Sequence, residues 1–557
     1  MSGDALSVWY GGSPGAAAVA GRDLVLEVPL EHGLLLPQGA ALDDYLDERS
    51  RPLVDRIARE RFERWRGRRT EALTVDGLDL ISLCELELLA QCFVSAARLE
   101  IGLPPALETA RVGRAILRAP GGADGIAGTL RAVAAGAGVA VETEAVGEGA
   151  RLEWRGASRP VRAAASLGFP ARVRGQVICV PYWILTPVFE RLLERGAGTT
   201  PVAAGIVLPG LDRRSTLQVA VRGGWMGHAG TRSRQVARGL VEQAVRFAAA
   251  DRPDGDAIDA ALDGWALQFV AEHAPSPVTA ARWARRAFAR GSVRAVVVPF
   301  DRPATVAALV VEARAAGIPS LLVQHGFDQG LGVPDKTHVD VAALWSERDR
   351  SILRDVSSAR PVVTGNPGAE HLASPGARAP RRDRTLLLVD YQSRLSASVP
   401  ERVSQLHLTT ALEAVAAARP GTTAVIRPHP ASLGAETTVP RPAGIAIEVD
   451  ATTPIETLSA GVDACVGAMS TATLQAGACG VPVVYLDVAG LERPWPFDGS
   501  AVPVARDASQ LADELAAAVE RPEVTGQADL LEALGARRGG TAAVTELVAE
   551  LAAGRPA

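Results

Sequence analysis

The stretch Val466-Gly-Ala-Met-Ser-Thr-Ala-Thr-Leu-Gln-Ala-Gly-Ala-Cys-Gly-Val-Pro-Val-Val-Tyr-Leu486 decides the fold class. An apolar run stops at a Ser/Thr cluster, a helical pattern continues to Gly480, and a second apolar run follows. Ser470 or Thr471 is well placed to cap the amino end of that helix. A buried strand, a capped helix and another buried strand are typical of an α/β fold with parallel strands.

The same alternation extends in both directions from this stretch. Val293–Pro299, Ala304–Ala316 and Ser320–Val323 have the spacing of a right-handed strand–helix–strand crossover. A second block of alternating elements follows residue 385. We therefore expect two doubly wound, Rossmann-like domains that face each other across a cleft. The expected divisions are an N-terminal domain over 1–370, a linker rich in Pro and Arg over 371–384, and a C-terminal domain over 385–557. A helical insertion is expected at about 40–115.

Composition excludes several classes of protein. A chain of 557 residues is too long for one core, and a net charge of −5 gives no electrostatic footprint for nucleic acid. The five cysteines lack metal-ligand spacing and lie on apolar segments, so reduced core thiols are expected. No signal peptide and no uncharged run of about 20 apolar residues is visible, which predicts a cytoplasmic protein.

Two histidine motifs follow predicted strands. In Gln324-His325-Gly326, the glycine permits a sharp turn that leaves the imidazole at the carboxyl end of its strand. A histidine there serves either as a general base near neutral pH or as a structural group bonded to a loop carbonyl. In Arg427-Pro428-His429-Pro430, the prolines fix His429 for contact with a phosphate oxygen. Arg427 is either an anion ligand or a salt-bridge partner inside its domain.

The cluster Ser470-Thr471-Ala472-Thr473 has two roles at once. It caps a helix, and the same geometry directs free backbone N–H groups and hydroxyls toward an anion. A phosphate or diphosphate is the expected ligand.

Weaker candidates lie near the expected cleft. Asp390 follows the first strand of the second block, and Asp301 follows the strand that ends at Pro299. Each is either an ordinary loop residue or a contact to an acceptor substrate. Trp495 and Phe497 either stack on a base or sugar or serve as packing anchors.

Together these motifs resemble the GT-B glycosyltransferases, most of all those of bacterial surface-polysaccharide and teichoic-acid synthesis. That group includes CDP-glycerol glycerophosphotransferases, polysialyltransferases and Kdo transferases. The resemblance covers about 290–490 and is weak over the first 170 residues. It is carried by the following motifs: His325 in QHG, Gly365-Asn366-Pro367, His429 in RPHP, Thr453-Pro454-Ile455-Glu456, and Ser470-Thr471 before a helix.

The resemblance implies roles for these residues. His429, Ser470 and Thr471 would hold the donor's phosphates, often those of CMP or CDP, with Arg427 and Thr473 nearby. Many relatives have Glu where Gln475 stands, and a carboxylate there would accept ribose hydroxyls. His325 would be the catalytic base. The remaining candidates are placed on the acceptor side or in secondary positions: Gln324, Gly326, Asp301, Asp390 and Glu456.

The implied activity is transfer of a sugar, or of a polyol phosphate, from a cytidine-nucleotide donor to a glycan or lipid-linked acceptor. A GT-B enzyme needs no metal or cofactor, because helix termini and side chains can neutralise the leaving phosphate. Peripheral membrane association stays open, and no nucleic-acid partner is expected. Two alternatives stay open as well: an isomerase like the UDP-N-acetylglucosamine 2-epimerases, and a catalytically silent GT-B binding protein.

Overall fold

A computed structural model describes the chain over these ranges: 5–9, 23–25, 40–47, 49–119, 124–145, 177–180, 185–194, 199–203, 224–225, 231–251, 255–301, 304–327, 338–372, 383–389, 403–428, 441–450, 452–488, 490, 495–521 and 525–554. Within these ranges it has three large sheets, and every strand pair in them is parallel. The predicted α/β class with two Rossmann-like parallel sheets is confirmed.

The first Rossmann-like sheet has seven strands in the order β10-β9-β8-β11-β12-β13-β14. Their bounds are β8 Val177–Cys179, β9 Thr199–Ala203, β10 Gly224–Trp225, β11 Ala295–Val298, β12 Ser320–Val323, β13 Val341–Leu344 and β14 Arg360–Val363. Its helices are α7 Thr186–Glu194, α12 Ala304–Ala315, α13 Glu347–Val356 and the 3₁₀ helix η6 Pro367–Leu372. The predicted crossover is confirmed as β11-α12-β12, with Val297 paired to Leu321.

The second Rossmann-like sheet has six strands in the order β17-β16-β15-β18-β19-β20. Their bounds are β15 Arg384–Val389, β16 Thr423–Pro428, β17 Ala446–Val449, β18 Ala464–Gly467, β19 Val483–Leu486 and β20 Val504–Ala505. The helices are α14 Val403–Ala418, α15 Ile455–Ser459, α16 Thr471–Ala478, α17 Ala508–Glu520, α18 Gln527–Ala533 and α19 Gly540–Ala552. The stretch quoted at the outset is therefore β18-α16-β19.

Residues 1–370, which we expected to form one domain with a helical insertion, contain a further parallel sheet of five strands. Its order is β3-β2-β1-β6-β7, with β1 Ala5–Trp9, β2 Asp23–Val25, β3 Ala40–Ala41, β6 Arg114–Ala119 and β7 Ala140–Ala145. The predicted helical segment is present next to it. Its elements are η2 Leu42–Tyr45, α1 Ser50–Arg69, the hairpin β4 Thr74–Val75 and β5 Leu78–Asp79, α2 Leu80–Leu83, α3 Glu85–Leu88, the π-helix η3 Leu89–Val94 and α4 Ser95–Ala110. A further helix, α5 Asp124–Gly136, connects β6 to β7.

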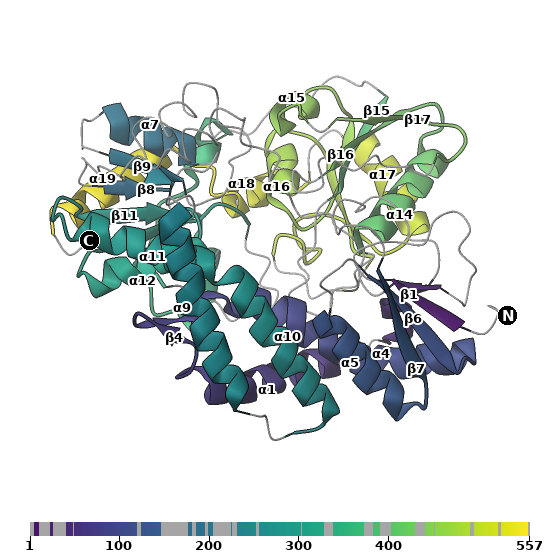
Figure 1. Ribbon diagram of the computed structural model, residues 1–557. Coiled ribbons are helices and arrows are strands. Elements are labelled where there is room, and N and C mark those ends of the chain that lie inside the picture. The colour runs from purple at the N-terminus through teal and green to yellow at the C-terminus, as the bar shows by residue number, and fades with distance from the viewer. Residues whose placement is uncertain are drawn as a thin grey trace.

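Three further helices join this helical segment to the seven-stranded sheet. They are α9 Thr231–Ala250, α10 Ala257–His273 and α11 Pro275–Phe288, and in Figure 1 α9 and α10 run side by side below that sheet. Buried ion pairs hold α1 to α10: Arg69 Nε lies 2.9 Å from Asp263 Oδ1, and Trp65 donates to the same oxygen. Arg69 and Asp263 are both buried, so each neutralises the charge of the other, which would be costly to bury alone.

Alternation along the strands divides the core. On β11, Ala295 and Val297 face one hydrophobic cluster, whereas Val296 and Val298 face another. On β15, Leu386 and Leu388 belong to the same cluster as Ala295 and Val297. One continuous apolar cluster therefore connects the two Rossmann-like sheets, as the period-2 pattern of strands allows.

The last helix crosses back from the second sheet to the first. α18 packs on α16 of the second sheet, whereas α19 packs on α7 and η6 of the first. Figure 1 shows α19 beside α7 and β8, away from α14 and α17. The turn between α18 and α19 contacts the predicted motif Gly365-Asn366-Pro367: the Asn366 N–H donates to the Gly535 carbonyl at 2.9 Å.

The carboxylate of Glu370 caps the amino end of α19. It accepts the N–H of Gly539 on one oxygen and that of Thr541 on the other, the latter at 3.1 Å. Burial opposes ionisation of Glu370, but the hydrogen bonds from Thr541 and Gly539 and the charge of Arg191 outweigh it, so the pKa of this carboxyl lies below its ordinary value.

We expect Glu370→Ala to lower the free energy of unfolding by about 1 kcal/mol at pH 7, as for loss of a helix cap. The native carboxylate gives stability above its unfolded pKa and loses it as pH falls through the lower folded pKa. In thermal melts from pH 7 to 3, the difference between the two proteins should therefore begin to shrink as pH falls below about 4.3, the ordinary pKa of Glu. A difference that stayed constant over this range would contradict the assignment.

Candidate functional site

Two of the predicted motifs meet at the seam between the Rossmann-like sheets. The Thr471 hydroxyl oxygen, at the amino end of α16, accepts the Phe327 N–H at 2.9 Å. A Cβ added to Gly326 would lie 3.8 Å from the same oxygen. The loop that follows β12 and the helix that follows β18 therefore touch, each at the carboxyl end of its strand, which is the ligand-binding edge of such sheets.

The helix amino end is built by local bonds. Ser470 has extended backbone angles, and its hydroxyl accepts the Thr473 N–H at 3.4 Å. The Thr473 hydroxyl donates to the Ala468 carbonyl at 2.6 Å. Gly467 is required here, because a Cβ on it would lie 2.4 Å from the Thr473 methyl carbon. Thr473 is thus a buried structural anchor, whereas Ser470 and Thr471 stay partly exposed.

His325 contacts residues that follow β11 of the seven-stranded sheet. Its Nδ1 lies 2.8 Å from the Pro299 carbonyl oxygen, and its ring packs edge-on against Phe300 at 5.4 Å. A carbonyl oxygen only accepts, so Nδ1 carries the proton and the lone pair of the neutral ring is on Nε2. This is the tautomer that a general base at Nε2 requires.

Burial sets the protonation state of His325. Desolvation disfavours the imidazolium and lowers the pKa of His325, against a smaller opposing effect of the bond to Pro299. The neutral ring is then the form present at pH 7.

We expect an NMR titration of the His325 imidazole to give a midpoint below 6.5, the ordinary histidine value. The signal is identified by its loss in His325→Gln. A midpoint at or above 6.5 would show that the ring is not desolvated as the structure has it.

Gln475 lies one turn farther along α16, and Glu456 lies beside it on α15. Gln475 follows Thr471 by four residues and so shares its face of the helix. Its side-chain nitrogen lies 3.4 Å from Glu456 Oε1, and His371 Nε2 of the first domain lies 3.7 Å from the same oxygen. The carboxylate that Gln475 lacks is therefore present beside it, on a neighbouring helix.

Two other predicted residues, Arg427 and Asp301, are bonded to protein groups. Arg427 donates to the Asp450 carbonyl at 3.1 Å and pairs with its carboxylate at 3.8 Å, which is the salt-bridge role within the second sheet. Burial lowers the pKa of Arg427, and the charge of Asp450 opposes this effect. Asp301 is buried and accepts the His338 N–H. His429 and Asp390 lie outside the described residues.

Gln324 and Phe497 have structural contacts. Both ends of the Gln324 side chain bond to protein groups, the Trp345 N–H and the Gly326 carbonyl, at 2.8 and 3.0 Å. Phe497 is a packing anchor, because it is fully buried and packs on Phe327 and Tyr485. A stacking surface for a ligand at Phe497 is thereby excluded.

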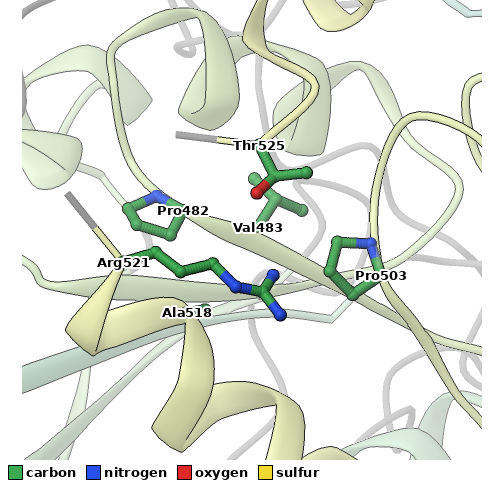
Figure 2. A pocket seen from close by; sticks show the side chains of 6 residues that line it. All are labelled: Pro482, Val483, Pro503, Ala518, Arg521 and Thr525. Atoms are coloured by element: carbon green, nitrogen blue, oxygen red, sulfur yellow. The ribbon is translucent and has the colours of Figure 1, made fainter. Parts of the chain in front are cut away.

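A shallow depression lies at the opposite edge of the second sheet. Figure 2 shows it between the amino ends of β19 and β20, and its lining residues are Pro482, Val483, Pro503, Ala518, Arg521 and Thr525. The strands run in parallel, so this edge is the one away from Ser470 and Thr471. Arg521 is the one charged residue among those that line it.

The described helices and side chains give three further observations. No described helix is both apolar enough and long enough to span a bilayer. In the same ranges, His, Cys, Asp and Glu side chains form no group of three suited to a metal ion. All five cysteines are unpaired thiols, and burial raises the pKa of Cys179 to about 12.

No protein-family model matches this chain, and no curated protein matches it in sequence. Solved structures match over about two thirds of it. UDP-GlcNAc 2-epimerase from Methanocaldococcus jannaschii is 12% identical, with a TM-score of 0.39 over 67% of this chain and 98% of its own. The S. aureus MnaA–UDP co-structure is 11% identical, with a TM-score of 0.41 over 69% of this chain and 99% of its own. Arabidopsis thaliana UGT89C1 is 12% identical, with a TM-score of 0.36 over 68% of this chain and 99% of its own. The fold assignment rests on the sheets described above.

Proposed function

We propose that this protein is a GT-B transferase that uses a nucleotide-activated sugar or polyol phosphate. The observation that carries the proposal is the contact between the QHG loop and the amino end of α16, through Phe327 and Thr471 at 2.9 Å. His325 precedes by two residues the Phe327 N–H that bonds to the helix amino end. A base and an anion site at one seam between two Rossmann-like sheets fit group transfer from a phosphate-linked donor.

The donor is assigned to the second sheet. Backbone N–H groups at the start of α16, with Ser470 and Thr471, would bind its phosphates, and the helix dipole would favour their charge. His429 would add a donor to the same phosphates. Gln475, one turn on, and Glu456 on α15, 3.4 Å from it, would accept the ribose hydroxyls. A cytidine nucleotide, CMP- or CDP-linked, is the donor class proposed.

The acceptor is assigned to the first sheet. An acceptor hydroxyl beside His325 would lose its proton to Nε2 while its oxygen bonds to the carbon or phosphorus that is transferred. The bond from that atom to the donor phosphate breaks, and the leaving nucleotide takes the electron pair. Its negative charge would be met by the α16 amino end. A glycan or lipid-linked acceptor is proposed.

Thermal melts with 1 mM CMP, CDP, UDP or GDP test the donor site, since a ligand stabilises only the state that binds it. We expect a cytidine nucleotide to raise Tm most. Thr471→Val should weaken the shift, because it keeps the shape and removes the hydroxyl. Thr109→Val, on the exposed end of α4, is the matched control. Equal shifts in all three proteins, or none in the native one, would contradict the proposal.

The isomerase alternative is decided by product analysis. Incubation with UDP-N-acetylglucosamine and no acceptor would give the 2-epimer if the protein is an epimerase, and unchanged substrate if it is a transferase. A protein that binds nucleotide but neither isomerises nor transfers would be the silent binding protein.

A further inference from the structure

The QHG loop is connected to the second domain at its other end as well, through Trp345. The Trp345 N–H donates to the Gln324 side-chain oxygen at 2.8 Å, and the Trp345 indole N–H donates to the Gln324 carbonyl at 2.9 Å. The Gln324 amide nitrogen then donates to the Gly326 carbonyl at 3.0 Å. His325 lies between the two residues that these bonds fix.

Trp345 is in turn pressed by the segment that leaves the second domain. Gly535 follows α18 with φ of +65°, and a Cβ on it would lie 2.7 Å from the Trp345 Cβ. The Trp345 side chain is 1% exposed, so the packed residues around it leave no space for it to shift. Its position therefore follows that of Gly535.

The position of Gly535 depends on that of α16, the helix that carries the proposed anion site, because Gly535 follows α18 and α18 packs on α16. α18 packs on α16 so closely that a Cβ on Gly477 would lie 2.1 Å from the Leu530 side chain. A rigid path thus runs from Thr471 along α16 to α18, then through Gly535 and Trp345 to Gln324. Both ends of the loop 324–327 are therefore connected to the second domain. Gln324 is connected through Trp345 and Gly535, and Phe327 through its bond to Thr471.

We propose that Trp345 and Gln324 are positioning residues that place the His325 imidazole relative to the amino end of α16. They touch no substrate; they transmit the placement of the second domain to the base. The assignment of a reacting base rests on the proposed function, whereas the placement of the ring by Trp345 is testable without it.

Trp345→Phe tests this proposal because it keeps an aromatic ring and removes the indole donor. A loop displaced by loss of the indole bond would move Nδ1 off the Pro299 carbonyl that sets the tautomer. Long-range ¹H–¹⁵N NMR should then show His325 as the single Nδ1–H tautomer in the native protein and as a mixture in the variant. In a transferase assay, kcat should fall at least tenfold while the donor KM and the nucleotide Kd change less than twofold. Trp283→Phe, in the other hydrophobic cluster, is the control for loss of a buried indole.

Gln324→Met provides a second test if Trp345→Phe does not fold, since it keeps the volume and removes both side-chain bonds. It should give the same mixed His325 tautomers. A native His325 spectrum and native kcat in either folded variant would overturn the proposal. Absent turnover in the native protein would count against the proposed function alone, because the NMR result decides the positioning role independently.

Discussion

Replacing His325 by alanine is expected to lower kcat by about 10²- to 10⁴-fold, the usual contribution of a general base. Nδ1 is bonded to the Pro299 carbonyl, so Nε2 is the ring nitrogen that would take the proton. The Kd for the donor nucleotide should change less than threefold, because the anion site is on α16. Initial rates and a calorimetric titration measure the two quantities.

A histidine outside the seam is the control. His273 on α10 stacks on Phe269, with ring centroids 4.1 Å apart, and His273→Ala should leave kcat unchanged. Turnover retained within threefold in His325→Ala would remove His325 from the mechanism. Loss of nucleotide binding in the same variant would instead make it a donor ligand.

Phe497→Ala is expected to lower the free energy of unfolding by about 3–5 kcal/mol, the range for truncation of a buried aromatic ring. Phe497 is fully buried, and its ring centroid lies 5.4 Å from that of Phe327 and 5.2 Å from that of Tyr485. The cavity would open beside the QHG loop, so the seam between the two sheets should loosen too. Scanning calorimetry suits this measurement, since a chain of several domains need not unfold in one step.

Two further variants serve as controls for Phe497→Ala. Phe497→Leu should cost much less, because it keeps most of the volume. Phe247→Ala, at a ring that is 70% exposed on α9, should stay within about 0.5 kcal/mol of the native protein. Equal effects at positions 497 and 247 would mean that the Phe327–Phe497 contact is not formed in solution.

Elements with strong local patterns were predictable from the sequence. The β11-α12-β12 crossover and the β18-α16-β19 unit follow from buried apolar runs and a capped helix, and both are present. Helix α11 was not predicted, and it begins with Pro275-Ser-Pro277. Proline is tolerated in the first turn of a helix, where its missing N–H needs no partner, and α11 begins at Pro275.

Long-range placement was less accessible to sequence reasoning. Helix α19 has an ordinary amphipathic pattern, and nothing in it states that it packs on the first Rossmann-like sheet rather than the second. The five-stranded sheet consists of short strands separated by long segments, and its grouping was not predicted. The predicted strand Leu217–Val221 lies outside the described residues.

The candidate site divides in the same way. Residue type and strand-end position singled out His325, Ser470 and Thr471, and the structure brings their segments together. Type alone could not tell that Gln324 has both ends of its side chain bonded internally, or that Arg427 pairs with Asp450. Trp345 carried no signal in the sequence, because a buried tryptophan after a strand is ordinary; only its contacts with Gln324 and Gly535 distinguish it.

A crystal structure of the protein with bound CDP is the most direct measurement of the central claim, that the seam between the QHG loop and α16 is a nucleotide site. We expect the diphosphate on the α16 amino end, within hydrogen-bond distance of Ser470 and Thr471, and on the side that faces His325. CDP bound elsewhere, with that helix end still closed by Phe327, would contradict the claim.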